Sequence, residues 1–359
     1  MKLVKSYIAS SVWGAIVTVL IVIMSLNSIS ALVDELSDIR ADYDLLEVVI
    51  YVCLRLPSGF YQFLPLSSLV GCLIGLGALA TSSELVVMRA AGVSVNQIIW
   101  AAFRPVFVFI AIGALVGEYV APYSDQYADS RRALAQGHNQ ALQSARGLWH
   151  REGNEFMHFN AVLPNGKLYG ITRFKIDDDR NLIEARFVDS AIFQGGYWFE
   201  QNVHLTKFEE DELTGETHVI KETLATGRWD SEVSPSLLNV LVLDPRALPM
   251  QRLYAYSAYL DRQNLNASEF RLAFWRKALQ PLATLSLVMI AISFILGPLR
   301  TVTMGFRVFV GVIVGLVFET SQKLLGPSSI ILGFSPMFAV LIPIFICFLV
   351  GIVFVRKAR

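Results

Sequence analysis

Six apolar segments, each long enough or nearly long enough to cross a lipid bilayer as a helix, dominate this sequence. A bilayer core requires roughly 20 apolar residues in helical form. The segments that qualify lie near 9–33, 57–80, 98–121, 276–297, 305–323 and 334–355. Hydrophobic residues make up 54% of the chain and charged residues only 17%, far from the balance of a soluble domain. The sequence therefore predicts a multi-pass α-helical membrane protein.

The only long polar region lies between the third and fourth spans and divides the chain into three parts. We predict spans one to three in 1–140, an inserted domain in 141–245, and a connecting helix with spans four to six in 246–359. Within the insert, short stretches follow the alternation of strands, and turn signals separate them. The predicted strands include 155–160, 186–189, 197–201 and 204–208, and the turns Asn165-Gly166, Asp177 to Asp179, Gly195-Gly196 and Thr214-Gly215. We therefore expect an antiparallel β domain, and the periodicity does not decide between a barrel and a jelly roll.

The basic residues of the short loops predict the orientation of the spans. If the N-terminus is cytoplasmic, most of these residues lie inside, and only Arg40 and Lys323 lie in the opposite short loops, as the positive-inside rule favours. Both termini and the loop after the second span would then be cytoplasmic. The β domain would lie outside the cytoplasm.

A short helix signature follows the second span, near 82–92. Ser82 or Ser83 could cap its N-terminus, Glu84 suits the positive end of the helix dipole, and Gly92 suits its C-terminal end. The apolar residues between them predict an amphipathic helix at the membrane surface. From these residues alone, a helix that only rests on lipid headgroups remains an equally good interpretation.

Four motifs resemble a known family along nearly the whole chain. SELVVMRAAG (83–92), GEYVAP (117–122), GLW (147–149) and FILGPLRTVTMGFRV (294–308) are similar to the LptF/LptG family, the permease subunits of the lipopolysaccharide-export ABC transporter, and to its LptG branch more than its LptF branch. The resemblance implies that the insert is a periplasmic β-jelly-roll. It also implies that the helix near 82–92 docks on an ATPase subunit, with Glu84, Leu85, Met88 and Arg89 as coupling residues.

The resemblance implies a role in an ATP-driven exporter of the bacterial inner membrane. Such a machine extracts lipopolysaccharide from the outer leaflet and passes it to a periplasmic bridge toward the outer membrane. The implied partners are an LptF-like permease, two LptB-like ATPase subunits and an LptC-like single-span protein. This chain contains no phosphate-binding P-loop sequence, so we expect no catalytic residue and no cofactor of its own, with ATP bound by the partner ATPase.

Arginines just beyond the third span are candidate ligands for the phosphates of lipid A. Arg131 and Arg132 carry planar guanidinium groups that match a phosphate bidentately, although a solvated arginine pair is an open alternative. By resemblance, Arg132 matches a lipopolysaccharide-contacting arginine of the family, while a second family arginine falls on Asp129 and a family lysine on Ala31. Arg55 is a candidate replacement for these missing charges. Phe63, again by resemblance, is expected to line the cavity for acyl chains.

Three spans contain glycines four residues apart. Such spacing lets helix backbones approach closely in lipid. The sequence leaves open whether these glycines pack within the chain's own bundle or at an interface with another subunit. The glycines are Gly71 with Gly75, Gly113 with Gly117, and Gly311 with Gly315.

Other functional classes have less support in the residues. The five histidines lack the spacing of metal ligands, so we expect no metal site. The formal net charge is zero, and no basic, aromatic-rich stretch indicates nucleic-acid binding. An LptF-type paralogue of the same complex is one alternative, and a membrane-anchored scaffold that presents the β domain is another. A scaffold would not need six spans or a structured cytoplasmic helix, and it would not copurify with an ATPase.

Overall fold

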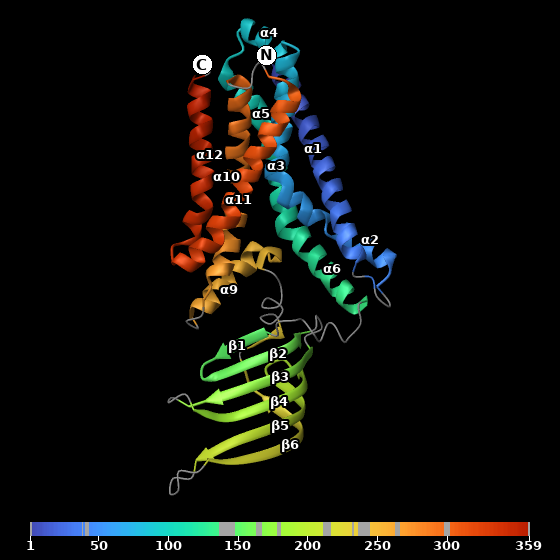
Figure 1. Ribbon diagram of the computed structural model, residues 1–359, viewed down its shortest axis with the longest axis vertical. Coiled ribbons are helices and arrows are strands. Elements are labelled where there is room, and N and C mark those ends of the chain that lie inside the picture. Colours follow the sequence, from blue (N-terminus) through green and yellow to red (C-terminus); the bar gives the residue numbers. More distant parts are fainter. Residues whose placement is uncertain are drawn as a thin grey trace.

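A helical bundle and a β domain beyond one of its ends form the computed structural model of this chain (Figure 1). Both termini and the short helix α4 lie at the end of the bundle that is far from the β domain (Figure 1). The structure describes residues 2–37, 39, 43–135, 148–162, 167–177, 181–210, 217–231, 233–235, 245–262, 266–297 and 302–357.

The bundle consists of long apolar helices with shorter segments at its two ends. Within the described residues, six helices are long and apolar enough to cross a membrane, which confirms the predicted number of spans. The long helices are α1 (Lys2–Leu36), α3 (Leu56–Thr81), α5 (Val95–Leu115), α10 (Ser268–Leu296), α11 (Met304–Leu332) and α12 (Pro336–Lys357). The shorter segments are α2 (Leu45–Leu54), α4 (Glu84–Ala90), the π-helical turn η1 (Val116–Val120), α6 (Ala121–Ala135), the 3₁₀ turn η2 (Pro245–Ala247) and α9 (Met250–Arg262).

Several helix ends differ from the prediction. α10 begins at Ser268, well before residue 276, because its first turns pack on α9 rather than on lipid. At the N-terminus of α10 the Asn266 side chain accepts from the Ser268 N–H at 2.9 Å, and Ala267 is the N-cap residue. α11 runs past residue 323 to Leu332 and ends before Gly333, whose φ of +72° terminates the helix.

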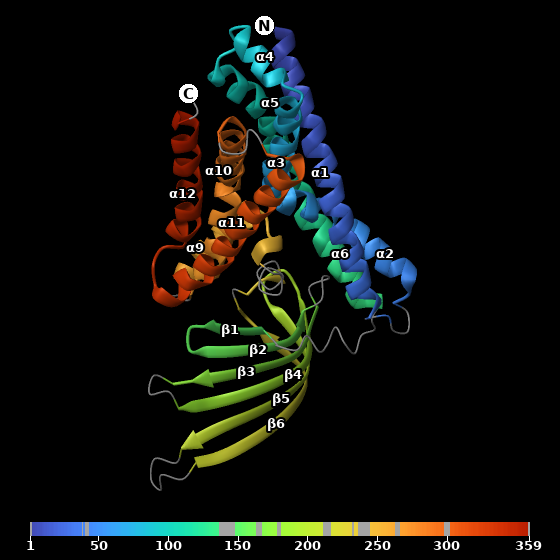
Figure 2. The same ribbon diagram turned by 45° about the horizontal axis from the view of Figure 1, so that its top comes forward.

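The helix α2 was not predicted. It has ten residues, too few to span a bilayer, and it lies beside the C-terminal end of α1 (Figure 2). The Asp44 carboxylate caps its N-terminus by accepting from the Glu47 N–H at 3.0 Å. Because α2 packs against α6, it brings its polar residues to the arginines that follow the third span.

All six glycines of the three spaced pairs face another helix of this same chain. A Cβ added at Gly71 would lie 2.5 Å from the Ile16 Cα of α1, and one at Gly75 would lie 2.8 Å from the Val12 Cα. The backbones of α1 and α3 are therefore in direct contact. The remaining pairs pack against side chains: Gly113 on Leu64, Gly117 on Tyr61, Gly311 on Leu73 and Gly315 on Leu66.

Gly71→Ala should destabilise the bundle, whereas Gly14→Ala should not. A Cβ at Gly71 meets the backbone of α1, so overpacking should cost about 1–3 kcal/mol. A Cβ at Gly14 of α1 meets nothing within 4 Å, so the better helix propensity of alanine should stabilise by up to about 1 kcal/mol. Thermal unfolding of the purified chain in detergent would measure both. Shifts of the same sign and size would contradict the α1–α3 contact.

The β domain is one sheet of six antiparallel strands in sequence order, and it is strongly curved (Figure 2). This arrangement confirms the predicted antiparallel β domain, whereas the jelly-roll assignment still depends on family resemblance. The strands are β1 (Leu148–Glu152), β2 (Glu155–Val162), β3 (Lys167–Ile176), β4 (Leu182–Phe193), β5 (Trp198–Glu210) and β6 (Thr217–Trp229).

Two predicted strands form a single strand, and one predicted turn is present. The predicted stretches 197–201 and 204–208 belong to one strand, β5, which begins at Trp198 and continues through Asn202 despite its φ of +53°. The turn at Gly195-Gly196 is confirmed, with a φ of +78° at Gly195. The predicted turns Asn165-Gly166 and Thr214-Gly215, the predicted turn residues Asp178 and Asp179, and the boundary at 140/141 lie outside the described residues.

Candidate functional site

The turn between α3 and α4 positions the predicted coupling helix. Ser83 adopts a left-handed conformation with a φ of +62°, and its main-chain carbonyl accepts from the N–H groups of Val86 and Val87. The predicted capping by a serine side chain is wrong. The Ser82 hydroxyl instead donates to the Glu84 carboxylate at 2.8 Å, because Ser82 still belongs to the C-terminal end of α3.

The C-terminal end of α4 closes as predicted, at a glycine. Gly92 has a φ of +90°, and its N–H donates to the Arg89 carbonyl at 3.0 Å. The Val93 N–H donates to the Met88 carbonyl, also at 3.0 Å, which completes a Schellman motif. Both ends of α4 are therefore held by main-chain hydrogen bonds.

The two faces of α4 have different surroundings. Leu85 is only 5% exposed and Met88 packs against the same core of the bundle, so these two predicted coupling residues anchor the helix. Val86 and Val87, at 44% and 66% exposure, point away from the bundle, and Arg89 is exposed. Glu84 is half-buried. A docking partner would therefore meet the two valines and Arg89, and the sequence analysis had not selected the valines.

At the opposite end of the bundle, α6 places Arg131 and Arg132 against acidic residues of α1 and α2. Arg131 binds the Glu47 carboxylate with two hydrogen bonds of 2.6 and 2.8 Å. These bonds hold the pKa of Glu47 below the usual value of a glutamate. Arg132 pairs with Glu35 at 2.5 Å, and the same carboxylate accepts from the Tyr43 hydroxyl at 2.9 Å.

Arg55 completes this cluster. It pairs with Asp129 of α6 at 2.9 Å, so the position where the family resemblance expects an arginine is an acid that binds Arg55 here. The guanidinium groups of Arg55 and Arg132 both lie over the Tyr51 ring, at 5.1 and 5.3 Å from its centroid. We call Glu35, Glu47, Arg55, Asp129, Arg131 and Arg132, grouped around Tyr51, the arginine cluster.

The acidic partners in the arginine cluster were missed as site residues by the sequence analysis. The density of acids in residues 34–47 was the sequence signal that could have revealed them. Folding brings Glu35 and Glu47 within reach of α6 because α2 turns back along it. Each predicted lipid-binding arginine is therefore neutralised by a carboxylate of the same chain.

Phe63 lies on α3 and is half-buried. A cavity of about 140 Å³ lies nearby between α3, α5, η1, α9 and α10, lined by residues such as Tyr61, Glu118 and Lys277. Phe63 does not line it. A hydrogen bond links η1 to α9 at this cavity, since the Glu118 carboxylate accepts from the Met250 N–H at 2.9 Å.

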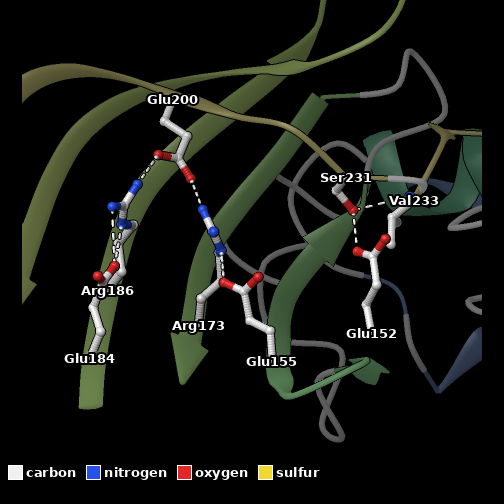
Figure 3. Close-up of polar contacts among 8 residues, drawn as sticks. All are labelled: Glu152, Glu155, Arg173, Glu184, Arg186, Glu200, Ser231 and Val233. Carbon is white, nitrogen blue, oxygen red and sulfur yellow. Dashed lines mark hydrogen bonds and ion pairs between the residues drawn. The ribbon is translucent and has the colours of Figure 1, made fainter. Parts of the chain in front are cut away.

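A chain of ion pairs crosses the buried face of the β domain (Figure 3). Glu200, with no exposed surface, binds Arg173 at 2.6 Å and Arg186 at 3.2 Å. Outer carboxylates complete the chain, Glu155 on Arg173 at 2.6 Å and Glu184 on Arg186 at 3.1 Å. The same face holds the apolar core of the domain: Met157, Phe159, Leu168, Ile171, Val188, Ala191, Trp198, Val203, Trp229 and Val233.

Metal ligands do not gather in the described part of the chain. Among those residues, no three His, Cys, Asp or Glu side chains lie close enough to hold a metal ion. The polar clusters consist mainly of arginine–carboxylate pairs, which suit the binding of anions and the locking of helices.

Comparisons with known proteins cover both halves of the bundle and the β domain. A family model described as lipopolysaccharide export system permease LptF/LptG matches residues 6–357. The chain is 32% identical over 349 residues to the lipopolysaccharide export system permease protein LptG of Escherichia coli strain K12, which covers 96% of each chain. It is 32% identical over 340 residues to the protein of that name from Haemophilus influenzae, covering 94% of this chain and 93% of the relative. The resemblance found in the motifs is confirmed, and this chain belongs to the LptF/LptG family of lipopolysaccharide export system permeases.

Proposed function

We propose that this chain is the LptG-type subunit of an ATP-driven exporter that lifts lipopolysaccharide out of the inner membrane. The family and the six apolar helices identify a multi-pass inner-membrane permease of lipopolysaccharide export, a transporter rather than an enzyme. The proposal adds the mechanism: an LptF-like permease pairs with this chain, and two LptB-like ATPase subunits drive the pair. An LptC-like single-span protein is the expected neighbour.

The observation that carries the proposal is the construction of α4. Leu85 and Met88 fix one face of this short helix in the core of the bundle, while Val86, Val87 and Arg89 stand outward. Because one face of α4 is packed in the core, a force that an ATPase subunit exerts on its exposed face would be transmitted to α3 and α5. Both termini lie at the same end of the bundle (Figure 1), which we take as cytoplasmic because the basic residues of the short loops concentrate there.

The arginine cluster then belongs to the periplasmic end, near the outer leaflet. Lipid A phosphates would compete with Glu35 and Glu47 for Arg132 and Arg131, since both kinds of anion fit a guanidinium fork. Acyl chains would occupy a cavity completed by the second permease, with Phe63 on its wall. The β domain would receive the lipid or guide it toward a periplasmic jelly-roll bridge.

The experiment that tests this function is purification of the chain from cells in mild detergent, followed by identification of copurifying chains and lipids. We expect a second permease, an ATPase and bound lipopolysaccharide, with ATP-dependent release after reconstitution into liposomes. A complex that contains no nucleotide-hydrolysing subunit would exclude the proposed mechanism and favour a membrane-anchored scaffold.

Lipid contact can be tested separately with a photo-crosslinking amino acid at Arg132 or Phe63. We expect both positions to capture lipopolysaccharide and the yield to change when ATP is supplied, because closure of the cavity would expel the lipid. Phe345 of α12, which is 57% exposed on the bundle surface, serves as the control and should show no response to ATP. If neither Arg132 nor Phe63 captures lipid despite efficient incorporation, the cavity assignment is wrong.

A further inference from the structure

α11 has little packing within this chain. Only 11% of the residues in its apolar 18-residue stretch are buried, compared with 67% for α3 and 61% for α10. Three of its buried residues, Arg307, Gly311 and Gly315, are spaced four apart, so they form one stripe along the helix. The two glycines let α11 approach Leu73 and Leu66 of α3 closely. At the N-terminal end of this contact with α3 lies the buried, charged side chain of Arg307.

Arg307 reaches the C-terminal end of α3. The side chain is 1% exposed, and its Nη1 donates to the Gly77 carbonyl at 2.6 Å and to the Thr81 hydroxyl at 2.9 Å. The carbonyl end of a helix carries partial negative charge, which favours a cation there. Gly77 provides the space, because an added Cβ would lie 3.1 Å from the guanidinium nitrogen.

This contact lies next to the coupling helix. Thr81 is the last residue of α3, and Ser82 follows it directly. The Ser82 hydroxyl donates to the Glu84 carboxylate at 2.8 Å. A short run of polar contacts and backbone therefore joins Arg307 of α11 to the first residue of α4. A charge buried among transmembrane helices is costly and is usually kept for a function, whereas an apolar side chain could fill the same space.

We propose that Arg307 is a positioning residue that transmits movement of α4 to α11. The inference deepens the proposed function and rests on it, because α4 must first receive work from an ATPase. When the α3–α4 turn shifts, the Gly77 carbonyl and the Thr81 hydroxyl carry the guanidinium with them. α11 can follow this pull because its other close contacts with α3 are at Gly311 and Gly315, and its contacts with α10 and α12 include Gln322, further along the helix.

Arg276 of α10 offers a matched control within the same bundle. Its Nη2 donates to the Gln322 carbonyl of α11 at 3.0 Å, and Gly326 provides space for it, since an added Cβ there would collide with the guanidinium. Both arginines thus bind a main-chain carbonyl beside a glycine and both tie α11 to a neighbouring helix. Only Arg307 lies next to α4.

The test compares Arg307→Met, Arg307→Lys and Arg276→Met in the purified complex reconstituted into liposomes. The measured quantity is lipopolysaccharide released per ATP hydrolysed. We expect Arg307→Met to lower this ratio about tenfold, the scale of losing a charge-assisted hydrogen bond. Arg276→Met should leave the ratio within about twofold of the unmodified chain, and Arg307→Lys should recover part of the loss because an ammonium can still donate to the carbonyl.

An unchanged ratio in Arg307→Met, or an equal fall in Arg276→Met, would overturn the inference. If Arg307→Met does not assemble, Thr81→Val decides the question, since it removes one acceptor and keeps the arginine. A fall of about threefold would support the link, and an unchanged ratio would overturn it. Glu84→Lys distinguishes failure of this inference from failure of the proposed function. If the Glu84 variant loses coupling while the Arg307 and Thr81 variants retain it, Arg307 does not transmit the movement, and the role of α4 in the proposed function stands.

Discussion

Glu84→Lys is expected to abolish lipopolysaccharide export while the chain still folds and inserts. The change places a cation in the first turn of α4, where the helix dipole favours an anion. It also removes the acceptor of the Ser82 hydroxyl and the interaction with the Tyr7 hydroxyl of α1. The dipole effect on folding is only about 0.3–1 kcal/mol, so the main loss should be transmission of work at the α3–α4 turn.

The measurement is growth of cells that depend on the variant, with ATP hydrolysis and lipopolysaccharide release by the purified complex. Glu269→Lys is the matched control, because Glu269 is also an acid in the first turn of a helix, is exposed, and starts α10 away from α4. Normal export by the Glu84 variant, with an ATPase still assembled, would reject the role of this helix. Loss of export in the control as well would point to a general effect of charge reversal.

Arg173→Met is expected to destabilise the β domain by up to about 3–5 kcal/mol, because it removes the closer of the two partners of a buried charge. Glu200 has no exposed surface and would keep only Arg186, at 3.2 Å. Arg173 also covers the Trp229 ring, 4.6 Å from its centroid, so the core loses part of its packing. Hydrogen exchange of the amides in β3 and β5 in the full-length chain would report the loss as faster exchange.

Arg228→Met is the control for removal of an arginine from an ion pair. Arg228 and Asp230 are 64% and 68% exposed, and a surface pair of this kind contributes no more than about 1 kcal/mol. A further variant that replaces Arg173, Arg186 and Glu200 together by apolar residues should recover most of the stability, since no buried charge is then left alone. If Arg173→Met and Arg228→Met have equal effects, the ion-pair chain is not the stabilising feature.

Local sequence patterns determined the order and type of most elements. Apolar length predicts the six spans because a bilayer sets a fixed thickness, and alternation with turn signals predicts the β domain because strands have a period of two residues. Gly92 was identifiable as the end of α4 because a positive φ suits glycine. These features depend on residues that are close together in the chain.

Only the tertiary structure showed which residues far apart in the sequence are in contact. Arg131 and Glu47 are 84 residues apart, and Arg307 and Gly77 are 230 apart, so no local period connects them. α2 was too short for a span, and its own sequence did not reveal that it would fold back on α6 with acids for the arginines. The sequence by itself determined the spans, the β domain and the family. Only the packing of helices decided that the predicted phosphate-binding arginines are paired with carboxylates, and that a buried arginine joins α11 to the α3–α4 turn.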